Sequence, residues 1–156
     1  LMIPRKGAVV AEITVTDLED VLEVRMALEE LAVKIACKRI TQEQLEEIKR
    51  RSAEFCKTLY GDDVAACAQA DMAFHDAIYE ATGNRRLVQI LNNLREQMYR
   101  YRMEYLKDRQ SHSLLVKEHE EIVQGLTERD ADRALSVTNS HIERQRDYII
   151  QQLQHK

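Results

Sequence analysis

The sequence has few of the residues that interrupt helices, and it has no long apolar run. Its 156 residues include one proline, four glycines and no tryptophan. No apolar run approaches the roughly 20 residues that span a bilayer, and the first residues do not resemble a signal peptide. Because helix breakers are scarce while Glu, Arg, Leu, Ala and Gln are abundant, the sequence predicts an all-α protein, and its length fits one domain with a sizeable core.

The cysteines argue against a secreted protein, and the net charge argues against a nucleic-acid-binding protein. The three cysteines form no CxxC motif and cannot all pair with one another, which favours a reducing, cytoplasmic setting over secretion. The formal net charge is −4, so the whole chain lacks the basic character typical of nucleic-acid binding. We therefore expect no membrane partner and no direct contact of this chain with DNA.

Residues 1–15 differ in composition from the rest of the chain. They contain the only proline, one glycine and a run rich in β-branched residues, which indicates an extended arm or strand. A lone strand is unstable in water unless it pairs with another segment. The helical domain is then predicted to cover residues 16–156.

Apolar periodicity and capping motifs predict an antiparallel bundle of about six helices. Thr16 and Thr41 each begin a capping box, with Glu19 and Gln44 three residues later. The apolar stripes of the predicted helices place Leu31 and Ile90 in the core. The first helix is predicted to begin at Thr16, and the later helices to cover about 41–60, 63–81, 85–108, 114–127 and 131–153.

Four residues in the predicted helix interiors suggest a metal site in the core of the bundle. Asp71 and His75 are four apart, so on a helix they share one face, one turn apart. His119 and His141 lie on either side of a predicted turn at 127–130, at similar distances from it. The two histidines of this hairpin are therefore expected to lie level with each other, and helical bundles commonly hold metals between facing helices.

The chemistry of these four side chains suits one divalent ion. Three imidazoles and one carboxylate favour Zn²⁺, with Ni²⁺, Mn²⁺, Co²⁺ or Fe²⁺ as alternatives, whereas Ca²⁺ and Mg²⁺ prefer oxygen ligands. Four protein ligands leave one or two positions for water or an anion when the ion is five- or six-coordinate.

Three arginines are candidates for binding that anion. Arg25 falls in the middle of the apolar stripe of the first helix, where it either extends to solvent, pairs with Glu29 one turn on, or binds a carboxylate in the interior. Arg95 and Arg102 are seven apart and flank the stripe of the predicted helix 85–108. We expect a small carboxylate effector that bridges the metal and Arg25.

These residues together resemble a known family. The chain is similar to the C-terminal effector-binding (FCD) domain of the FadR branch of the GntR family of bacterial transcription regulators, over about residues 10–153. The resemblance is carried by Asp17-Leu18, Val24 to Glu29, Asp71-x-x-Phe74-His75, Gly83-Asn84, Glu118-His119 and His141.

The resemblance implies a specific set of roles for these residues. It implies that Asp71, His75, His119 and His141 hold a divalent metal and that Arg25 approaches the effector carboxylate. It also implies a homodimer that binds DNA only through an N-terminal winged-helix domain. Residues 4–12 resemble the last strand of that domain, so the sequence is expected to be the effector domain without its winged helix.

The same residues also allow other interpretations of the function. Zinc held by three histidines with an open position can activate water, so a metal-dependent hydrolase with this three-His/Asp site is the alternative function, although Asp71 as a fourth ligand fills a position that catalysis needs open. No further Glu or His is picked out by spacing as a general base, which favours a sensor that is not an enzyme. A structural bundle with core histidines is the third reading. A ferritin-like di-metal site is set aside because the chain has no Glu-x-x-His motif.

Overall fold

Helices account for nearly all of residues 13–155, which are the residues that the computed structural model describes. No strand occurs within this range, so the expected all-α antiparallel bundle is confirmed. The predicted arm at 1–15 lies, as far as residue 12, outside the described residues. The helices are α1 (Val15–Arg39), α2 (Gln42–Thr58), α3 (Val64–Ala81), α4 (Arg85–Asn93), α5 (Arg95–Leu106), α6 (His112–Glu128) and α7 (Ala131–Gln154), with a short 3-10 helix, η2 (Arg109–Ser111), before α6.

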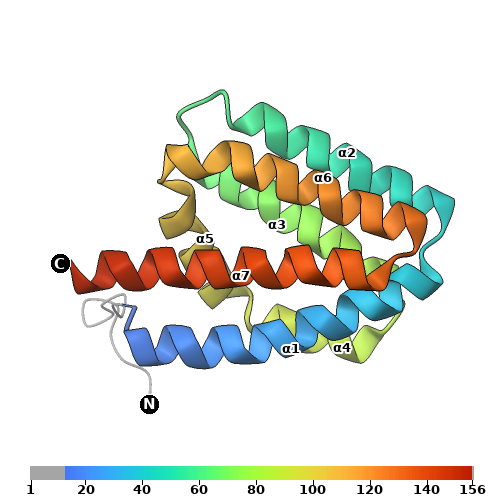
Figure 1. Ribbon diagram of the computed structural model, residues 1–156, viewed down its shortest axis with the longest axis horizontal. Coiled ribbons are helices and arrows are strands. Elements are labelled where there is room, and N and C mark those ends of the chain that lie inside the picture. The colour runs from blue at the N-terminus through green and yellow to red at the C-terminus, as the bar shows by residue number, and fades with distance from the viewer. Residues whose placement is uncertain (1–12, 156) are drawn as a thin grey trace, which may run out of the picture.

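The long helices α1 and α7 lie side by side and run in opposite directions (Figure 1). Helix α7 also pairs with α6, and α6 in turn packs against α2, which pairs with α3. Helix α5 packs against α3 and α7, while α4 contacts α1. The space between α1, α3, α5, α6 and α7 therefore forms the interior of the bundle.

The prediction of a single helix over residues 85–108 is wrong, because this segment forms two helices. Helix α4 ends at Asn93, and Leu94 between the helices has φ −95° and ψ 2°, outside the α-helical region. The break changes the direction of the chain, so Leu87 and Leu91 pack with Ala32 of α1 while α5 turns toward α3 and α7. Packing against two different neighbours outweighs the continuous apolar repeat that suggested one helix.

Two other expectations about the helices need correction. The side chain that caps α1 is Thr14, which accepts from the backbone N–H of Asp17, so the predicted start at Thr16 is wrong by two residues. Leu31 and Ile90 were predicted to be in the core, but they are 45% and 47% exposed. By contrast, the capping box at Thr41 and Gln44 is confirmed.

The hairpin between α6 and α7 is tightly packed at its closed end. A Cβ at Gly125 would lie 2.8 Å from the Cβ of Ala134, which only a glycine permits. Arg129 follows α6 in the left-handed region (φ 55°), and its guanidinium donates to the carbonyls of Cys37 and Ile40 at the end of α1. This turn fixes α6 and α7 relative to each other and to α1. Within residues 13–155 no helix combines the length and the apolar character needed to cross a membrane.

Candidate metal centre

Three helices supply the four candidate metal ligands to the interior of the bundle. Asp71 and His75 come from α3, His119 from α6 and His141 from α7, and each is at most 2% exposed. The i, i+4 spacing on α3 places Asp71 and His75 on one inward face. The α6–α7 hairpin brings the other two histidines beside them.

The donor atoms of three of these residues converge. One ligand atom each from Asp71, His75 and His119 lie within 4.8 Å of one another. Asp71 Oδ1 is 2.9 Å from His119 Nε2 and 3.5 Å from His75 Nε2. The ring of His141 is next to this group, with its centroid 5.9 Å from that of His75 and 6.4 Å from that of His119.

The orientation of His119 is fixed by aromatic packing. Its ring stacks on Phe74 with centroids 4.1 Å apart and an interplanar angle of 18°, and lies 4.7 Å from the ring of Phe55. Phe55 and Phe74 are completely buried. A ring held in this way loses little further freedom when it binds a ligand.

The polar atoms of this cluster fit a metal better than they fit one another. Within residues 13–155, Asp71 Oδ1, His75 Nε2 and both ring nitrogens of His119 and His141 are buried and have no hydrogen-bond partner of acceptable geometry. Buried polar atoms are normally paired, because burying them without a partner costs free energy. The donor set of three imidazoles and one carboxylate is one that a divalent ion such as Zn²⁺ satisfies.

The ionisation of the cluster also suits a metal. Burial lowers the pKa of His75 to about 4 and that of His141 to about 3, although Asp71 opposes both shifts. Burial alone would raise the pKa of Asp71, but His75, His119 and Arg102 together hold it well below its usual range. Near neutral pH, His75 and His141 are therefore neutral and Asp71 is anionic, which are the forms that bind metal.

Arg25 lies inside the bundle beside this cluster. Its side chain is completely buried, so it does not extend to solvent. Its Nη1 donates to Gln145 Oε1 of α7 at 2.7 Å, and its Nε lies 3.5 Å from Glu29 Oε1. Tyr79 of α3 donates its hydroxyl to the same Glu29 oxygen. Burial favours protonated Glu29, but Arg25, His75, Tyr79 and Arg102 together lower its pKa, so it is anionic.

The structure separates the two other candidate arginines. Arg102 is 2% exposed, and its Nε lies 2.8 Å from Asp71 Oδ2. Arg95 lies at the surface, where its side chain is 47% exposed and its Nη1 is 2.7 Å from Asp76 Oδ2. Arg95 is the first residue of α5, whereas Arg102 lies about two turns further along the same helix, where it reaches the interior.

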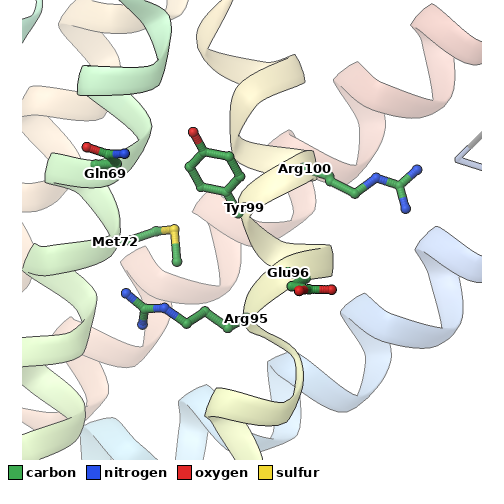
Figure 2. A pocket seen from close by; sticks show the side chains of 6 residues that line it. All are labelled: Gln69, Met72, Arg95, Glu96, Tyr99 and Arg100. Atoms are coloured by element: carbon green, nitrogen blue, oxygen red, sulfur yellow. The ribbon is translucent and has the colours of Figure 1, made fainter. Parts of the chain in front are cut away.

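Arg95 instead lines a surface pocket of about 490 Å³ between α3 and α5. Figure 2 shows Met72 of α3 and Tyr99 of α5 pointing toward each other across this pocket, with Arg95 reaching from α5 toward α3. Arg100 extends to the opposite side of α5 (Figure 2). Arg95 is therefore not among the side chains that surround the buried cluster.

A buried carboxylate supports His141 from behind. Glu118 of α6 is 4% exposed, and its Oε1 lies 3.5 Å from His141 Nδ1. Arg144, on the same helix as His141, pairs with the other oxygen of Glu118. A carboxylate near the second nitrogen of a metal-binding histidine orients the ring and raises its basicity.

Four further residues of the site were not predicted from the sequence, although the first belongs to the motif that carries the family resemblance: Glu118, Tyr79, Gln145 and Arg144. The spacing of two of them carries a signal, because Tyr79 and Gln145 each lie four residues after a candidate ligand, His75 and His141. Glu118 and Arg144 have no such signal, since they pair across the α6–α7 hairpin.

Comparisons with known proteins agree with this architecture. The FCD domain family matches residues 20–144. A curated relative, the uncharacterized HTH-type transcriptional regulator YdhC of Bacillus subtilis (strain 168), is 22% identical over 139 residues, which is 88% of this chain and 62% of the relative. The chain thus spans less than two thirds of the length of that relative.

Three solved structures share the fold at low sequence identity. They are E. coli McbR/YncC (TM-score 0.83, 16% identity, 92% of this chain and 72% of that one), a GntR family transcriptional regulator from Pseudomonas syringae pv. tomato str. DC3000 (0.73, 20%, 97% and 63%) and the metal-free FCD domain of TM0439 (0.76, 16%, 94% and 100%).

Proposed function

The chain belongs to the FCD domain family, and from this we propose that it is the ligand-sensing domain of a bacterial GntR-type transcription regulator of the FadR branch. The ligand in this proposal is a small organic acid, bound beside a divalent metal. The observation that carries the proposal is the buried convergence of Asp71, His75 and His119, with His141 alongside and Arg25 close by. The relatives that match are regulators, which supports a role in control rather than in catalysis.

In this proposal, Asp71, His75, His119 and His141 hold one metal ion, with zinc preferred and nickel, manganese, cobalt or iron as alternatives. The ion supplies a positive centre that binds an oxygen of the acid. Burial keeps His75 and His141 neutral, and the interactions with His75, His119 and Arg102 together keep Asp71 charged. Neutral His75 and His141 bind metal without first releasing a proton, so these two ligands should add no pH dependence to the metal affinity near neutrality.

The proposed acid is also bound by a guanidinium. Arg25 carries one nitrogen, Nη2, that is buried and has no hydrogen-bond partner within residues 13–155. A guanidinium binds a carboxylate through two parallel N–H groups, so Arg25 can hold the far end of a metal-bound acid. Arg102 is assigned to the same group of effector contacts, and Arg95 is left with Asp76 at the surface.

Binding of the acid is proposed to change how the helices pack. Arg25 on α1 contacts Gln145 on α7 and Glu29, which in turn contacts Tyr79 on α3. An acid that binds Arg25 competes with these contacts, so it favours one arrangement of α1 over another. In the full-length regulator, this movement would alter the spacing of winged-helix domains on DNA in the cytoplasm.

We propose a homodimer as the unit in which this control operates. Apolar side chains on α1 and α4 are exposed, with Val24 at 50%, Leu31 at 45% and Ile90 at 47%. These two helices pack against each other along one edge of the bundle (Figure 1). Exposed apolar side chains on neighbouring helices suit a protein–protein interface, and a second copy of the chain is the proposed occupant.

The proposal is tested by loading the purified chain with zinc and screening acids by thermal shift. Protein made without a nickel column and analysed for metal should contain about one divalent ion per chain. Sugar acids, hydroxy acids and dicarboxylates should raise the melting temperature of the zinc-loaded protein. If no acid raises the melting temperature, and the protein instead hydrolyses carboxylate esters or amides, a metal-dependent hydrolase is the better interpretation.

A further inference from the structure

Two arginines are buried beside the candidate metal centre, and each has a donor left over. Arg25 is fully buried and Arg102 is 2% exposed. Within residues 13–155, the Nη2 atom of each guanidinium is buried, and its N–H groups have no hydrogen-bond acceptor. Leaving a buried charged donor unpaired is costly, because the group has lost its water. Two such donors in one core indicate that a ligand completes them.

Both arginines act on the same group of side chains. Arg25 pairs with Glu29, which accepts a hydrogen bond from Tyr79 of α3, and Arg102 pairs with Asp71 of the same helix. Asp71, His75 and Tyr79 are spaced four residues apart, so they share one face of α3. The two guanidiniums therefore approach that face on either side of His75, and both border the candidate metal ligands.

The charges of this cluster cancel before any metal is added. Arg25 is paired with Glu29, Arg102 with Asp71, and Glu118 with Arg144. Imidazoles bind a metal in their neutral form, so the histidines of the site add no charge. A divalent ion would therefore bring two positive charges that the described side chains do not compensate, and uncompensated charge in a buried site is costly.

We propose that the effector is a dicarboxylate, with one carboxylate bound by Arg25 and the other by Arg102. This inference rests on the proposed function and narrows its ligand class. A dianion compensates both charges of the metal, and it gives each buried Nη2 an acceptor. A monocarboxylate does only half of this, since it leaves one positive charge and one guanidinium donor unsatisfied.

The test is calorimetry on the zinc-loaded chain with acids matched in carbon number. Malonate, succinate and glutarate are compared with propionate, butyrate and valerate, and inorganic phosphate is included as a dianion with a single acid group. The metal content of the protein is measured after each titration, because dicarboxylates also bind free zinc. At least one dicarboxylate should bind roughly 30-fold or more tightly than its matched monocarboxylate, as expected for one buried charged contact.

Variants then locate the second carboxylate. Arg102→Gln should weaken the dicarboxylate to the level of its matched monocarboxylate, whose own affinity should change little. Arg102→Lys keeps the charge but not the planar donor pair, so it should retain part of the preference for the dicarboxylate over the monocarboxylate. This variant replaces Arg102→Gln in the comparison if the glutamine variant loses its metal. Arg95→Gln is the matched control, because Arg95 is exposed and paired with Asp76, and it should leave both affinities unchanged.

The possible outcomes separate this inference from the proposed function. Binding of no acid at all would overturn the proposed function itself. Equal affinities within every matched pair would overturn the dicarboxylate and leave the acid sensor standing. Phosphate binding more tightly than any dicarboxylate would replace the two-carboxylate ligand with a compact dianion. A dicarboxylate preference that survives both Arg102 variants would remove Arg102 from the site.

Discussion

Removal of metal is the perturbation that bears most directly on the candidate centre. A ligand that binds only the folded state stabilises it by about 4 kcal/mol when its free concentration is about a thousand times its dissociation constant. For a chain of this length, about 1 kcal/mol corresponds to about 2–4 °C in melting temperature. We therefore expect EDTA to lower the melting temperature of zinc-loaded protein by about 8–16 °C, measured by calorimetry or circular dichroism.

The variant that tests this expectation is His119→Ala. His119 is buried between Phe55 and Phe74, so its removal also leaves a cavity and lowers stability without any metal effect. The readout is therefore the difference between melting temperatures with and without EDTA, which should shrink to a small fraction of the wild-type value. His155→Ala is the matched control, because His155 is exposed at the end of α7 and its loss should leave that difference unchanged.

Two outcomes would contradict the assignment of a metal to this site. An EDTA effect of less than about 2 °C on protein shown to carry one zinc per chain would mean that the ion does not stabilise the fold. An effect of full size in His119→Ala would show that the ion is bound elsewhere. Either result would leave the converging buried atoms of Asp71, His75 and His119 without the role proposed for them.

Three further predictions concern the rest of the molecule. Arg25→Ala should weaken binding of the best acid about 30-fold or more while the metal content stays at one ion per chain. Arg25→Lys should recover only part of the lost affinity, because lysine lacks the planar donor pair. An unchanged affinity in Arg25→Ala would mean that Arg25 is only a structural partner of Glu29. Arg129→Ala removes three charged hydrogen bonds to carbonyls at the end of α1. It should destabilise the chain by about 2 kcal/mol, or about 4–8 °C, which a melting curve within 1 °C of wild type would contradict. Leu31→Glu places a charge on the exposed apolar face and should yield monomers by light scattering at concentrations where wild type is dimeric, whereas an unchanged mass would exclude that face.

The sequence by itself determined the features that depend on local spacing. The helical periodicity and the scarcity of breakers predicted the all-α bundle, and the capping box at Thr41 marked the start of a helix. The four-residue spacing put Asp71 and His75 on one face of α3. The similar distances of His119 and His141 from one turn predicted that a hairpin would bring them close together. Each of these inferences needs only the geometry of a helix and of the hairpin that joins two helices.

Only the tertiary structure decided where the chain changes direction and which face of each helix is covered. The repeat in residues 85–108 is continuous, yet the chain breaks at Leu94, since α4 packs on α1 and α5 on α3. Within α5, Arg102 lies against Asp71 in the interior, whereas Arg95, the first residue of the helix, lies at the surface with Asp76, although both flank the same stripe in the sequence. Leu31 and Ile90 are exposed for the same kind of reason, because apolar periodicity shows that a face exists but does not specify what covers it. Burial and pairing depend on neighbours far apart in the chain, and those neighbours are set by packing rather than by local pattern.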